Sequence, residues 1–431
     1  MISVSELKTA ITERVNRYNQ QDLPLTARAK EKRGLMTCQN HILATDIKSG
    51  FDVPRQNLSA MDGYALAIGS VLDAGTQIEI IGESQAGTPF SGELQPGQGV
   101  RIFTGAVVPD GCDTVVMQEN TNFADIQHSI DKSQSYAITL TQAAAVDKNI
   151  RKQGEEITQG EVVLQAGKRL NPADISLLAN LGIAKVEVYK PLVIGILATG
   201  DELVNVGEPL ETLAQIYNSN TPTLKSMLVQ LPVVIHDYDI IPDHLEMTRK
   251  AVTTAMQECD VIISTAGVSV GDYDFLTAVI EELGQINHYK VAMKPGKPFV
   301  FGELTKDLEH PVLYFGLPGN PLSAVVGTLQ FILPALWQLS GVQASDMPLT
   351  LNLQAKLGAD VKKRPGRTDF QRGILHQEAE GYVVKPAGKQ DSHRIKQLSL
   401  ANCLIVLPRE AGSMSAGETV EVQLFPWYTK L

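Results

Sequence analysis

The stretch from residue 260 to 322 constrains the fold of this chain most strongly, because it contains three apolar runs that each end in a glycine-rich turn. The runs read DVIISTAGVSVGDYDF, HYKVAMKPGKPFVFGE and PVLYFGLPGNPLSA. An apolar run that stops at Gly together with Ser, Asp, Lys or Asn is typical of a buried parallel strand whose carboxyl end leads into a loop. Ligands of open α/β sheets bind at that edge, where the strand order reverses. We therefore expect the chemistry of this chain in these turns.

The segment around these runs alternates between strand-like and helix-like patterns. From Pro191 onward it reads strand PLVIGILAT, helix NSNTPTLKSMLVQL, strand VVIHDYDII and helix DHLEMTRKAVTTAMQE, and a last helix runs from Pro321 to about Leu339. Alternating elements of these lengths predict a parallel sheet covered by helices on both faces. We expect a doubly wound α/β domain over residues 189–342.

The rest of the chain predicts three further domains, since 431 residues exceed one ordinary core. Residues 51–150 contain short β-branched runs between Gly and Pro, which indicate a small inserted β-rich domain. The flanking segments 1–50 and 151–188 carry helix-start signals at Ser3 and Asn171, so we expect a discontinuous helical linker domain. Residues 343–431 read as short strands of an all-β, barrel-like domain.

Charge and cysteine content limit the possible partners and compartments. The net charge is −11 without a block of like charges, which argues against nucleic acid or acidic membranes as partners. Four scattered cysteines without a CxxC pair, and no signal-peptide core, favour a reducing, cytoplasmic location. The uncharged stretch from Pro311 to Ser345 is interrupted by prolines and glutamines, so a buried strand and helix is favoured over a membrane span.

Two of the glycine-rich turns predict an anion site. KPGKP carries Lys294 and Lys297 on a loop stiffened by prolines, and LPGNP precedes a helix whose free N–H groups suit phosphate or oxyanion. The alternative for each alone is a solvated lysine pair and a ligand-free strand-to-helix turn.

Carboxylates at three strand ends predict a divalent metal beside that anion. Glu202 follows the first strand, Asp243 the second, and Asp272 and Asp274 the third. Carboxylates next to lysines suit Mg²⁺ held between anionic oxygens, although Asp243 could equally cap a helix. The eight histidines are scattered and no GxxxxGK[ST] motif is present, so zinc and a P-loop are not indicated.

Nine motifs occur in order over nearly the whole chain: SAMDGYA, RIFTGA, NIRKQGEE, ATGDEL, GVSVGDYDF, KPGKPFVFG, LPGNP, RPGRTDF and SHRI. Together they resemble the molybdopterin molybdenumtransferases of the MoeA type, a family similar to the enzymatic domain of gephyrin. The resemblance implies a homodimer of four-domain subunits, whose central domain is of the molybdopterin-binding, MogA-like kind. It also implies that molybdate and adenylylated molybdopterin react to give the molybdenum cofactor and AMP, with Mg²⁺ as the divalent ion.

The resemblance also implies residue roles. The active cleft would lie between the α/β domain of one subunit and the β-rich domain of the other. The catalytic residues carried over are Asp62, Thr104, Glu202, Asp243, Asp274, Lys294 and Lys297, with Glu202, Asp243 and Asp274 at the metal. The substrate-binding residues are Gly200, Asp201, Gly267, Ser269, Gly271, Pro318, Gly319, Asn320, Pro321, Arg367 and Ser392. The chain departs from the family at Glu156, where Asp is usual, and at Ala266, where Gly is usual.

Two other functions stay open at this point. One is molybdopterin adenylyltransferase, which shares the α/β domain and is also a candidate pathway partner. The other is a non-catalytic scaffold like gephyrin, for which this chain lacks the additional N-terminal domain and long linker. Molybdate and tungstate are equally compatible with the sequence.

Overall fold

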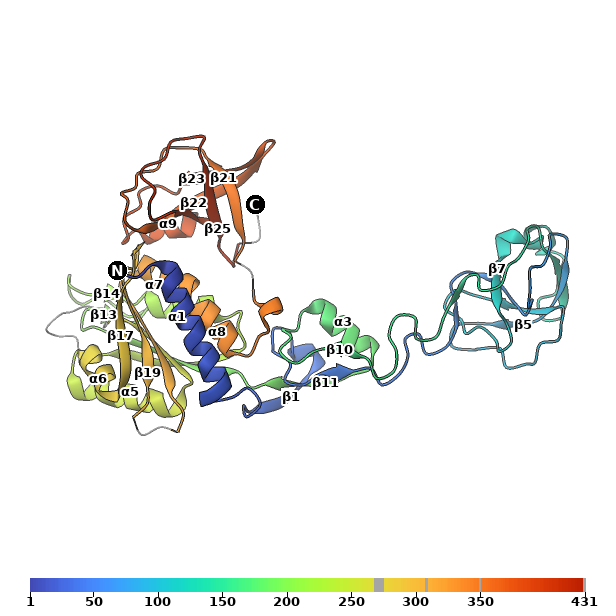
Figure 1. Cartoon of the computed structure of the whole chain (residues 1–431), viewed down its shortest axis with the longest axis horizontal. Helices are drawn as coiled ribbons and strands as arrows, with labels where there is room; N and C mark the ends of the chain where they lie inside the picture. Colours follow the sequence, from blue (N-terminus) through green and yellow to red (C-terminus); the bar gives the residue numbers. More distant parts are fainter. Residues whose placement is uncertain (267–274, 307–308, 349, 429–431) are drawn as a thin grey trace. The chain divides into compact units, whose positions relative to one another are not determined.

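The computed structural model describes residues 1–266, 275–306, 309–348 and 350–428. The chain forms two compact units (Figure 1). The large unit consists of Met1–Thr45 and Ala166–Leu431, and the inserted unit consists of Asp46–Gln165. Each unit has its own core and is described separately.

A six-stranded sheet forms the centre of the large unit. Its order is β15 (Val233–Ile241), β12 (Leu192–Thr199), β16 (Val261–Thr265), β20 (Val312–Leu317), β19 (Pro298–Leu304) and β17 (Gly284–Lys290). The first four strands are parallel, as predicted. β19 runs in the opposite direction, and β17, which pairs antiparallel with β19, runs in the same direction as the first four. The KPGKP run therefore follows a strand that ends at the expected edge of the sheet, but the expected parallel pairing is wrong, because its neighbour β19 is antiparallel. The segment that joins β17 to β19 is too short for the crossover that two parallel neighbours need.

Helices cover both faces of this sheet, which confirms the doubly wound prediction. One face packs against α1 (Val4–Arg17), α4 (Asn220–Leu228) and the helical stretch Pro321–Leu339, which comprises α7, η4 and α8. The other face packs against α5 (Leu245–Glu258) and α6 (Phe275–Leu283).

The stretch Pro321–Leu339 is, among the described residues, the one helix long and apolar enough to cross a membrane. Within its most apolar window, 83% of the residues are buried inside the molecule, which is the behaviour of a core helix.

The N-terminal helix α1 belongs to the same core. The Ser3 hydroxyl accepts from the backbone N–H of Glu6 and the Glu6 carboxylate accepts from that of Ser3, so the predicted capping box is present. Figure 1 shows α1 alongside α8, where Leu7 and Ile11 are buried. The linker segments also contain helix α3 (Pro172–Asn180) in the large unit and two short strand pairs, the first in the large unit and the second in the inserted unit. These pairs are β1 (Lys30–Gly34) with β11 (Lys185–Tyr189), and β2 (Ile47–Lys48) with β10 (Val162–Leu164).

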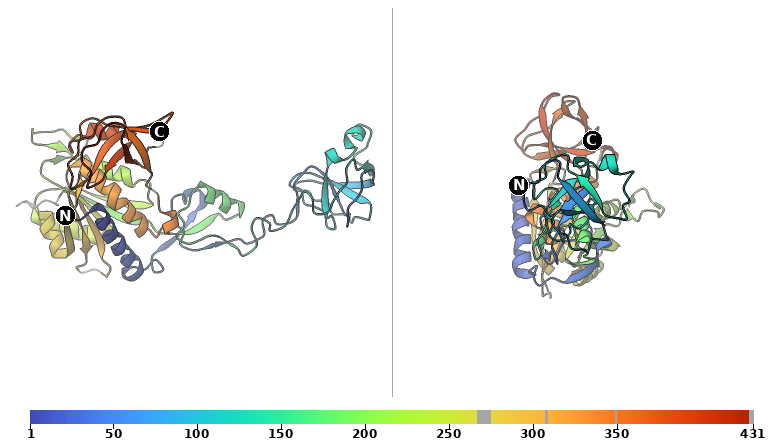
Figure 2. Two further views of the ribbon diagram at one scale, coloured as in Figure 1. Left: turned by 45° about the horizontal axis from the view of Figure 1, so that its top comes forward. Right: turned by 90° about the vertical axis from the view of Figure 1, so that its right-hand side faces the viewer.

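The C-terminal strands close into a five-stranded barrel, as expected (Figure 2). Their order is β22 (Thr368–Glu378), β23 (Gly381–Pro386), β21 (Asn352–Leu357), β25 (Thr419–Leu424) and β24 (Cys403–Leu407), and β24 pairs back with β22. A sixth strand, β18 (Met293–Lys294), comes from the α/β domain and pairs in parallel with β22. This pairing places Lys294 opposite Asp369 and ties the barrel to the α/β domain.

The inserted unit is built on a five-stranded sheet, in agreement with the predicted β-rich character. Its order is β7 (Thr114–Met117), β4 (Gly63–Leu66), β6 (Gln98–Ile102), β5 (Gln77–Ser84) and β8 (Tyr136–Thr139). Tyr64, Leu66 and Ile80 form its core, where Tyr64 meets Phe123 edge-on.

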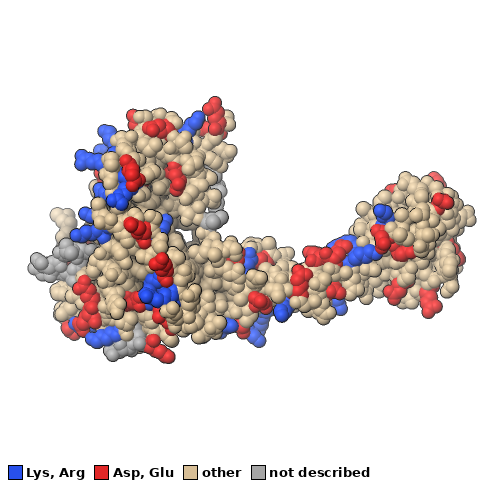
Figure 3. Space-filling view, in the orientation of Figure 1, with Lys and Arg blue, Asp and Glu red and all other residues tan. Residues whose placement is uncertain are grey.

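Charged side chains of both signs are distributed over the face shown in Figure 3. Among the described residues on that face, Lys and Arg do not gather into one broad basic surface of the kind that binds nucleic-acid backbones.

Ala266, at the end of β16, adopts φ +97°, a conformation that L-residues rarely adopt. Replacing it with glycine is expected to stabilise the large unit by about 1 kcal/mol, because glycine adopts this backbone without strain. The measurement is the urea midpoint of that unit. Ala198→Gly, inside strand β12, is the matched control and should lower the midpoint. A midpoint lowered by Ala266→Gly would contradict the strain argument.

Candidate functional site

The two predicted lysines flank the tight loop between β18 and β19. Gly296 in this loop has φ +91°, and the backbone N–H of Val291 donates to the carbonyl of Lys297 at 2.7 Å. The loop therefore needs glycine at its centre and has a defined path. Because β19 is antiparallel to β20 and pairs Val300 with Gly316, the loop lies at the carboxyl edge of the parallel strands.

A cavity of about 250 Å³ lies where this loop meets the barrel. It brings together four residues predicted from the sequence, namely Lys294, Lys297, Arg367 and Ser392. It is also lined by residues that were not predicted, namely Met293, Pro295, Gly296, Ser323, Asp369, Phe370 and Gln390. We refer to this cavity as the lysine pocket. Its size suits a small tetrahedral anion.

The lysine pocket is cationic. Three of its lining side chains are positively charged and one, Asp369, is negatively charged. The Nζ of Lys294 lies 3.8 Å from Oδ2 of Asp369, and Lys294 is 47% exposed whereas the carboxylate is 7% exposed. Gln371 Nε2 also donates to this carboxylate at 3.2 Å. The excess of two positive charges favours an anion, and Asp369 orients one of the two ammonium groups.

The pocket residues that were not predicted lie close in sequence to predicted ones, but the sequence does not show that they reach the pocket. Asp369 stands two residues after Arg367 in RPGRTDF, and Ser323 stands two residues after Pro321. Neither spacing shows that β18 pairs with β22, and this pairing brings Asp369 to Lys294. A local sequence pattern cannot predict a strand pair that is only two residues long and joins distant parts of the chain.

Asp369→Asn is expected to tighten binding of a dianion to the lysine pocket about three-fold or more, because it removes the one negative charge from the lining. Calorimetric titration with sodium molybdate measures the change. Asp346→Asn is the control, since this carboxylate is paired with Lys168 at 2.8 Å and does not line the pocket. Weaker binding by Asp369→Asn would instead give Asp369 a role in holding the ligand.

The predicted carboxylates lie farther along the same edge of the sheet. Asp201 and Glu202 follow β12, Asp243 follows β15, and Asp201 Oδ1 accepts the backbone N–H of Asp243 at 3.0 Å. All three are exposed. Gly200 has φ +141°, and a Cβ there would meet the Glu202 carboxylate at 2.4 Å, so Glu202 folds over this glycine. From β12 to β19 there are three strand spacings, roughly 14 Å in all.

The predicted metal site is only partly covered by the described residues. Asp274 lies outside them, as do Gly267, Ser269 and Gly271. In the described ranges, no three His, Cys, Asp or Glu side chains form a group that could hold a metal ion. Glu202 and Asp243 offer carboxylate oxygens, the donor type that Mg²⁺ prefers, and the remaining ligands would have to come from substrate oxygens, water or other residues.

The turn LPGNP connects β20 to the long core helix. Pro318 is buried, and the Gly319 carbonyl accepts from the Asn220 side chain at 2.8 Å. Asn320 precedes the helix without a side-chain capping bond, and Pro321 is its first residue. The turn lies beside the lysine pocket, because Ser323 of the same helix lines it.

In the inserted unit, Asp62 and Thr104 form a pair. Asp62 Oδ1 accepts from the backbone N–H of Thr104 at 2.7 Å and from its hydroxyl at 2.8 Å. The two donors hold the pKa of the Asp62 carboxyl below its ordinary value of 3.8. Both residues are exposed, so an ionised carboxylate of fixed orientation faces solvent.

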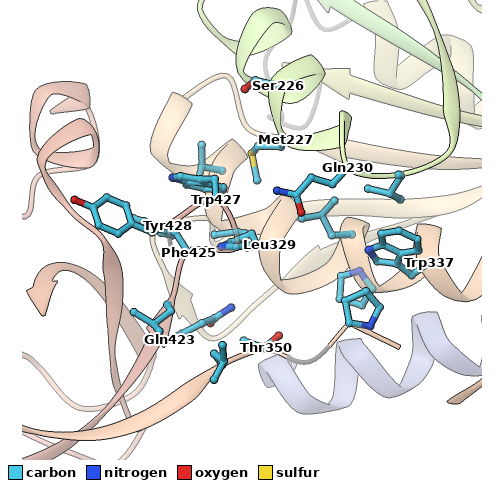
Figure 4. A pocket seen from close by; sticks show the side chains of 18 of the residues that line it. Ser226, Met227, Gln230, Leu329, Trp337, Thr350, Gln423, Phe425, Trp427 and Tyr428 are labelled. Carbon is cyan, nitrogen blue, oxygen red and sulfur yellow. The ribbon is translucent and has the colours of Figure 1, made fainter. Parts of the chain in front are cut away.

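A larger cavity of about 770 Å³ lies elsewhere in the large unit (Figure 4). Its lining is mostly apolar and includes Leu329, Trp337, Phe425 and Trp427. Its one cationic lining residue, Arg169, stacks on Trp337 with 4.4 Å from guanidinium carbon to ring centroid. The chemistry of this cavity does not suit a small dianion, and the lysine pocket remains the candidate site.

Comparison with known proteins shows which family this chain belongs to. The chain is 40% identical over 396 residues to a molybdopterin molybdenumtransferase of Haemophilus influenzae, covering 92% of this chain and 94% of the relative. It is 34% identical to the enzyme of the same name from Bacillus subtilis, covering 89% of this chain and 87% of the relative. The chain belongs to the molybdopterin molybdenumtransferase family.

Three family models match successive parts of the chain. They are "MoeA N-terminal region (domain I and II)" over residues 2–182, "Probable molybdopterin binding domain" over residues 195–338, and "MoeA C-terminal region (domain IV)" over residues 354–425. The solved structure of the molybdopterin biosynthesis MoeA protein from Pyrococcus horikosii superposes with a TM-score of 0.78 at 25% identity, covering 99% of this chain and 100% of that chain. The MoeA-type architecture therefore extends over the whole chain.

Membership of the molybdopterin molybdenumtransferase family bears on the alternatives left open by the sequence. An adenylyltransferase would need only the α/β domain, whereas the matches include the N-terminal and C-terminal regions of MoeA.

Glu156, where the family usually has Asp, has an exposed carboxylate 3.8 Å from the guanidinium of Arg151. Arg151 makes a shorter ion pair, at 2.9 Å, with Glu155.

Proposed function

We propose that this chain transfers molybdate onto adenylylated molybdopterin, giving the molybdenum cofactor and AMP. The observation that carries the proposal is the lysine pocket, where Lys294, Lys297 and Arg367 converge at the junction of the α/β domain and the barrel. Molybdate is a compact tetrahedral dianion, and fixed cations in a small cavity compensate such a charge in a protein whose net charge is −11. Ser392 adds a hydroxyl that can donate to one of its oxygens.

The second substrate, adenylylated molybdopterin, is long. The polar groups along the carboxyl edge of the sheet are spaced widely enough to contact both of its ends. The carboxylates after β12 lie roughly 14 Å from the β19 end and the carboxylate after β15 roughly 19 Å, three and four strand spacings away. In our proposal the reacting end of the pterin substrate lies at the lysine pocket, and its phosphate groups extend toward Glu202, Asp243 and Asp274. Mg²⁺ would be held there between these carboxylates and the phosphate oxygens, where it would stabilise the charge on the departing AMP.

Asp62 and Thr104 complete the proposal from the inserted unit. Because the pKa of Asp62 is lowered, it acts as a carboxylate rather than as an acid, and we assign it to cleavage of the adenylate. In a homodimer, the inserted unit of the partner subunit would supply this carboxylate to the cleft. A reducing, cytoplasmic setting accommodates the four free cysteines.

The test is a single-turnover assay with purified chain, adenylylated molybdopterin, molybdate and Mg²⁺. The proposal predicts AMP release that depends on molybdate and stops when EDTA removes the metal. Incubation with ATP and free molybdopterin separates the adenylyltransferase alternative, because pyrophosphate release would support it. An equal rate of AMP release with and without molybdate would refute the proposed transfer.

A further inference from the structure

Arg372 is a fully buried arginine in the barrel, directly behind the lysine pocket. It lies on β22, three residues after Asp369, and its relative exposure is 0%. Among the described residues its guanidinium has no carboxylate ion-pair partner, and Asp391 and Asp369 act on it only at longer range. Burial lowers the pKa of this group from its ordinary value. A buried cation of this kind is costly unless its hydrogen bonds are all used.

The side-chain hydrogen bonds of Arg372 all go to one segment. Its NH1 donates to the carbonyl of Arg394 at 2.9 Å and its NH2 to the carbonyl of Lys389 at 3.0 Å. Its Nε and its backbone N–H donate to Gln390 Oε1 at 3.2 and 2.9 Å. The carboxamide of Gln390 in turn donates to the carbonyl of Arg372 at 3.1 Å. The guanidinium therefore spans both ends of the segment 389–394.

This segment has little else to hold it. None of residues 388–394 is buried. The other hydrogen bonds of the segment, from Arg394 to Asp391 and from Gln390 to the carbonyl of Gly388, are internal. In the described part of the chain, the side-chain hydrogen bonds that tie this segment to the rest of the protein are made between it and Arg372. Arg372 is therefore the main side-chain anchor of the segment between β23 and helix α9 (Ile395–Leu400).

The segment forms one wall of the lysine pocket. Ser392 and Gln390 line that pocket, and both also line an adjoining hollow of about 690 Å³ together with Lys389 and His393. Ser392 lies between the two carbonyls that Arg372 holds. Movement of the segment would therefore displace Ser392 and open the pocket toward solvent.

We infer that Arg372 is a positioning residue for the oxyanion site, which holds Ser392 and Gln390 against the lysines through the main chain of residues 389–394. It does not touch the ligand. Its fixed positive charge, uncompensated by a neighbouring carboxylate, also adds to the attraction for a dianion in the pocket. The inference rests on the proposed function, since it concerns the binding of molybdate.

The test uses the full-length chain and sodium molybdate as the titrant. Arg372→Met should raise the molybdate Kd about ten-fold or more, and Arg372→Lys about three-fold or more, because lysine keeps the charge but cannot span both carbonyls. In turnover, KM for molybdate should rise while KM for adenylylated molybdopterin is retained. Hydrogen exchange of residues 388–394 should accelerate in both variants.

Arg14→Met is the matched control. Arg14 is another buried arginine, 8% exposed, but it is paired with Asp22 and Glu303 and does not line the pocket. It should lower thermal stability and leave the molybdate Kd unchanged. If Arg372→Met does not fold, the molybdate Kd and the hydrogen exchange of Arg372→Lys test the inference. Folded Arg372 variants with a Kd within two-fold of the native chain and unchanged exchange would overturn the inference. Failure of the native chain to bind molybdate would instead refute the proposed site, whatever the exchange result.

Discussion

Replacing Lys294 with methionine is expected to lower kcat/KM for molybdate insertion by about 100-fold or more. A charge-assisted hydrogen bond to an oxyanion contributes about 1.5–3 kcal/mol, and each 1.4 kcal/mol is a factor of ten. The variant also leaves Asp369, 3.8 Å away in the native chain, without its cation. A mostly buried carboxylate would then face the incoming dianion and add repulsion to the lost attraction. Single-turnover AMP release at varied molybdate measures the effect.

Lys306→Met is the matched control for this variant. Lys306 is 48% exposed and pairs with Glu282 at 3.1 Å, which closely reproduces the exposure and pairing of Lys294 away from the lysine pocket. Its loss should change kcat/KM less than two-fold. Equal losses from the two variants would show that surface charge in general, rather than this pocket, governs the rate.

Replacing Asp62 with asparagine is expected to slow AMP release by roughly 100-fold or more while substrate binding stays nearly intact. Asparagine can still accept both hydrogen bonds from Thr104, so the geometry is retained and only the charge is lost. Because the pKa of Asp62 is lowered, the carboxylate is ionised well below neutral pH. Its contribution should therefore be constant between about pH 5 and 9 and decline only toward strongly acidic pH. Rapid-quench measurement of AMP at several pH values tests both statements.

The inserted unit contains a second aspartate with the same kinds of hydrogen-bond donor, which serves as a control. Asp131 Oδ1 accepts from the backbone N–H of Ser133 at 2.9 Å and from its hydroxyl at 2.7 Å, and these donors also lower its pKa. Asp131→Asn therefore removes a carboxylate charge that accepts from the same kinds of donor, within one turn and outside the proposed site. It should leave AMP release unchanged. Unchanged AMP release in Asp62→Asn would remove Asp62 from the chemistry.

Features of the fold that depend on local patterns were predicted correctly. The capping box at Ser3 and the Asn171–Pro172 helix start are both present. Strand VVIHDYDII has the predicted bounds. These signals depend on residues within one turn or one strand, where side-chain chemistry and spacing determine the backbone.

Features that depend on partners far away in the sequence were not predicted. KPGKP reads like the end of a parallel strand, yet the strand before it, β17, pairs only with the antiparallel strand that follows it, β19. KEKRG shows no apolar alternation, yet it pairs as β1 with β11. In both cases the strand partner, rather than the local pattern, decides the structure.

In the candidate site, too, residues in distinctive local motifs were predicted and residues that depend on long-range contacts were not. Lys294, Lys297, Arg367 and Ser392 were found because their motifs are distinctive, and the structure places them together. Asp369 and Arg372 lie on the same short stretch of sequence, but their roles arise from the pairing of β18 with β22 and from the path of residues 389–394. Neither is visible in the spacing of residues.

The most direct measurement is a crystal of the full-length chain soaked with molybdate, with anomalous scattering recorded at the molybdenum edge. The account predicts one strong molybdenum peak within hydrogen-bonding distance of Lys294, Lys297, Arg367 and Ser392. A peak elsewhere, with these four side chains holding only water, would contradict it.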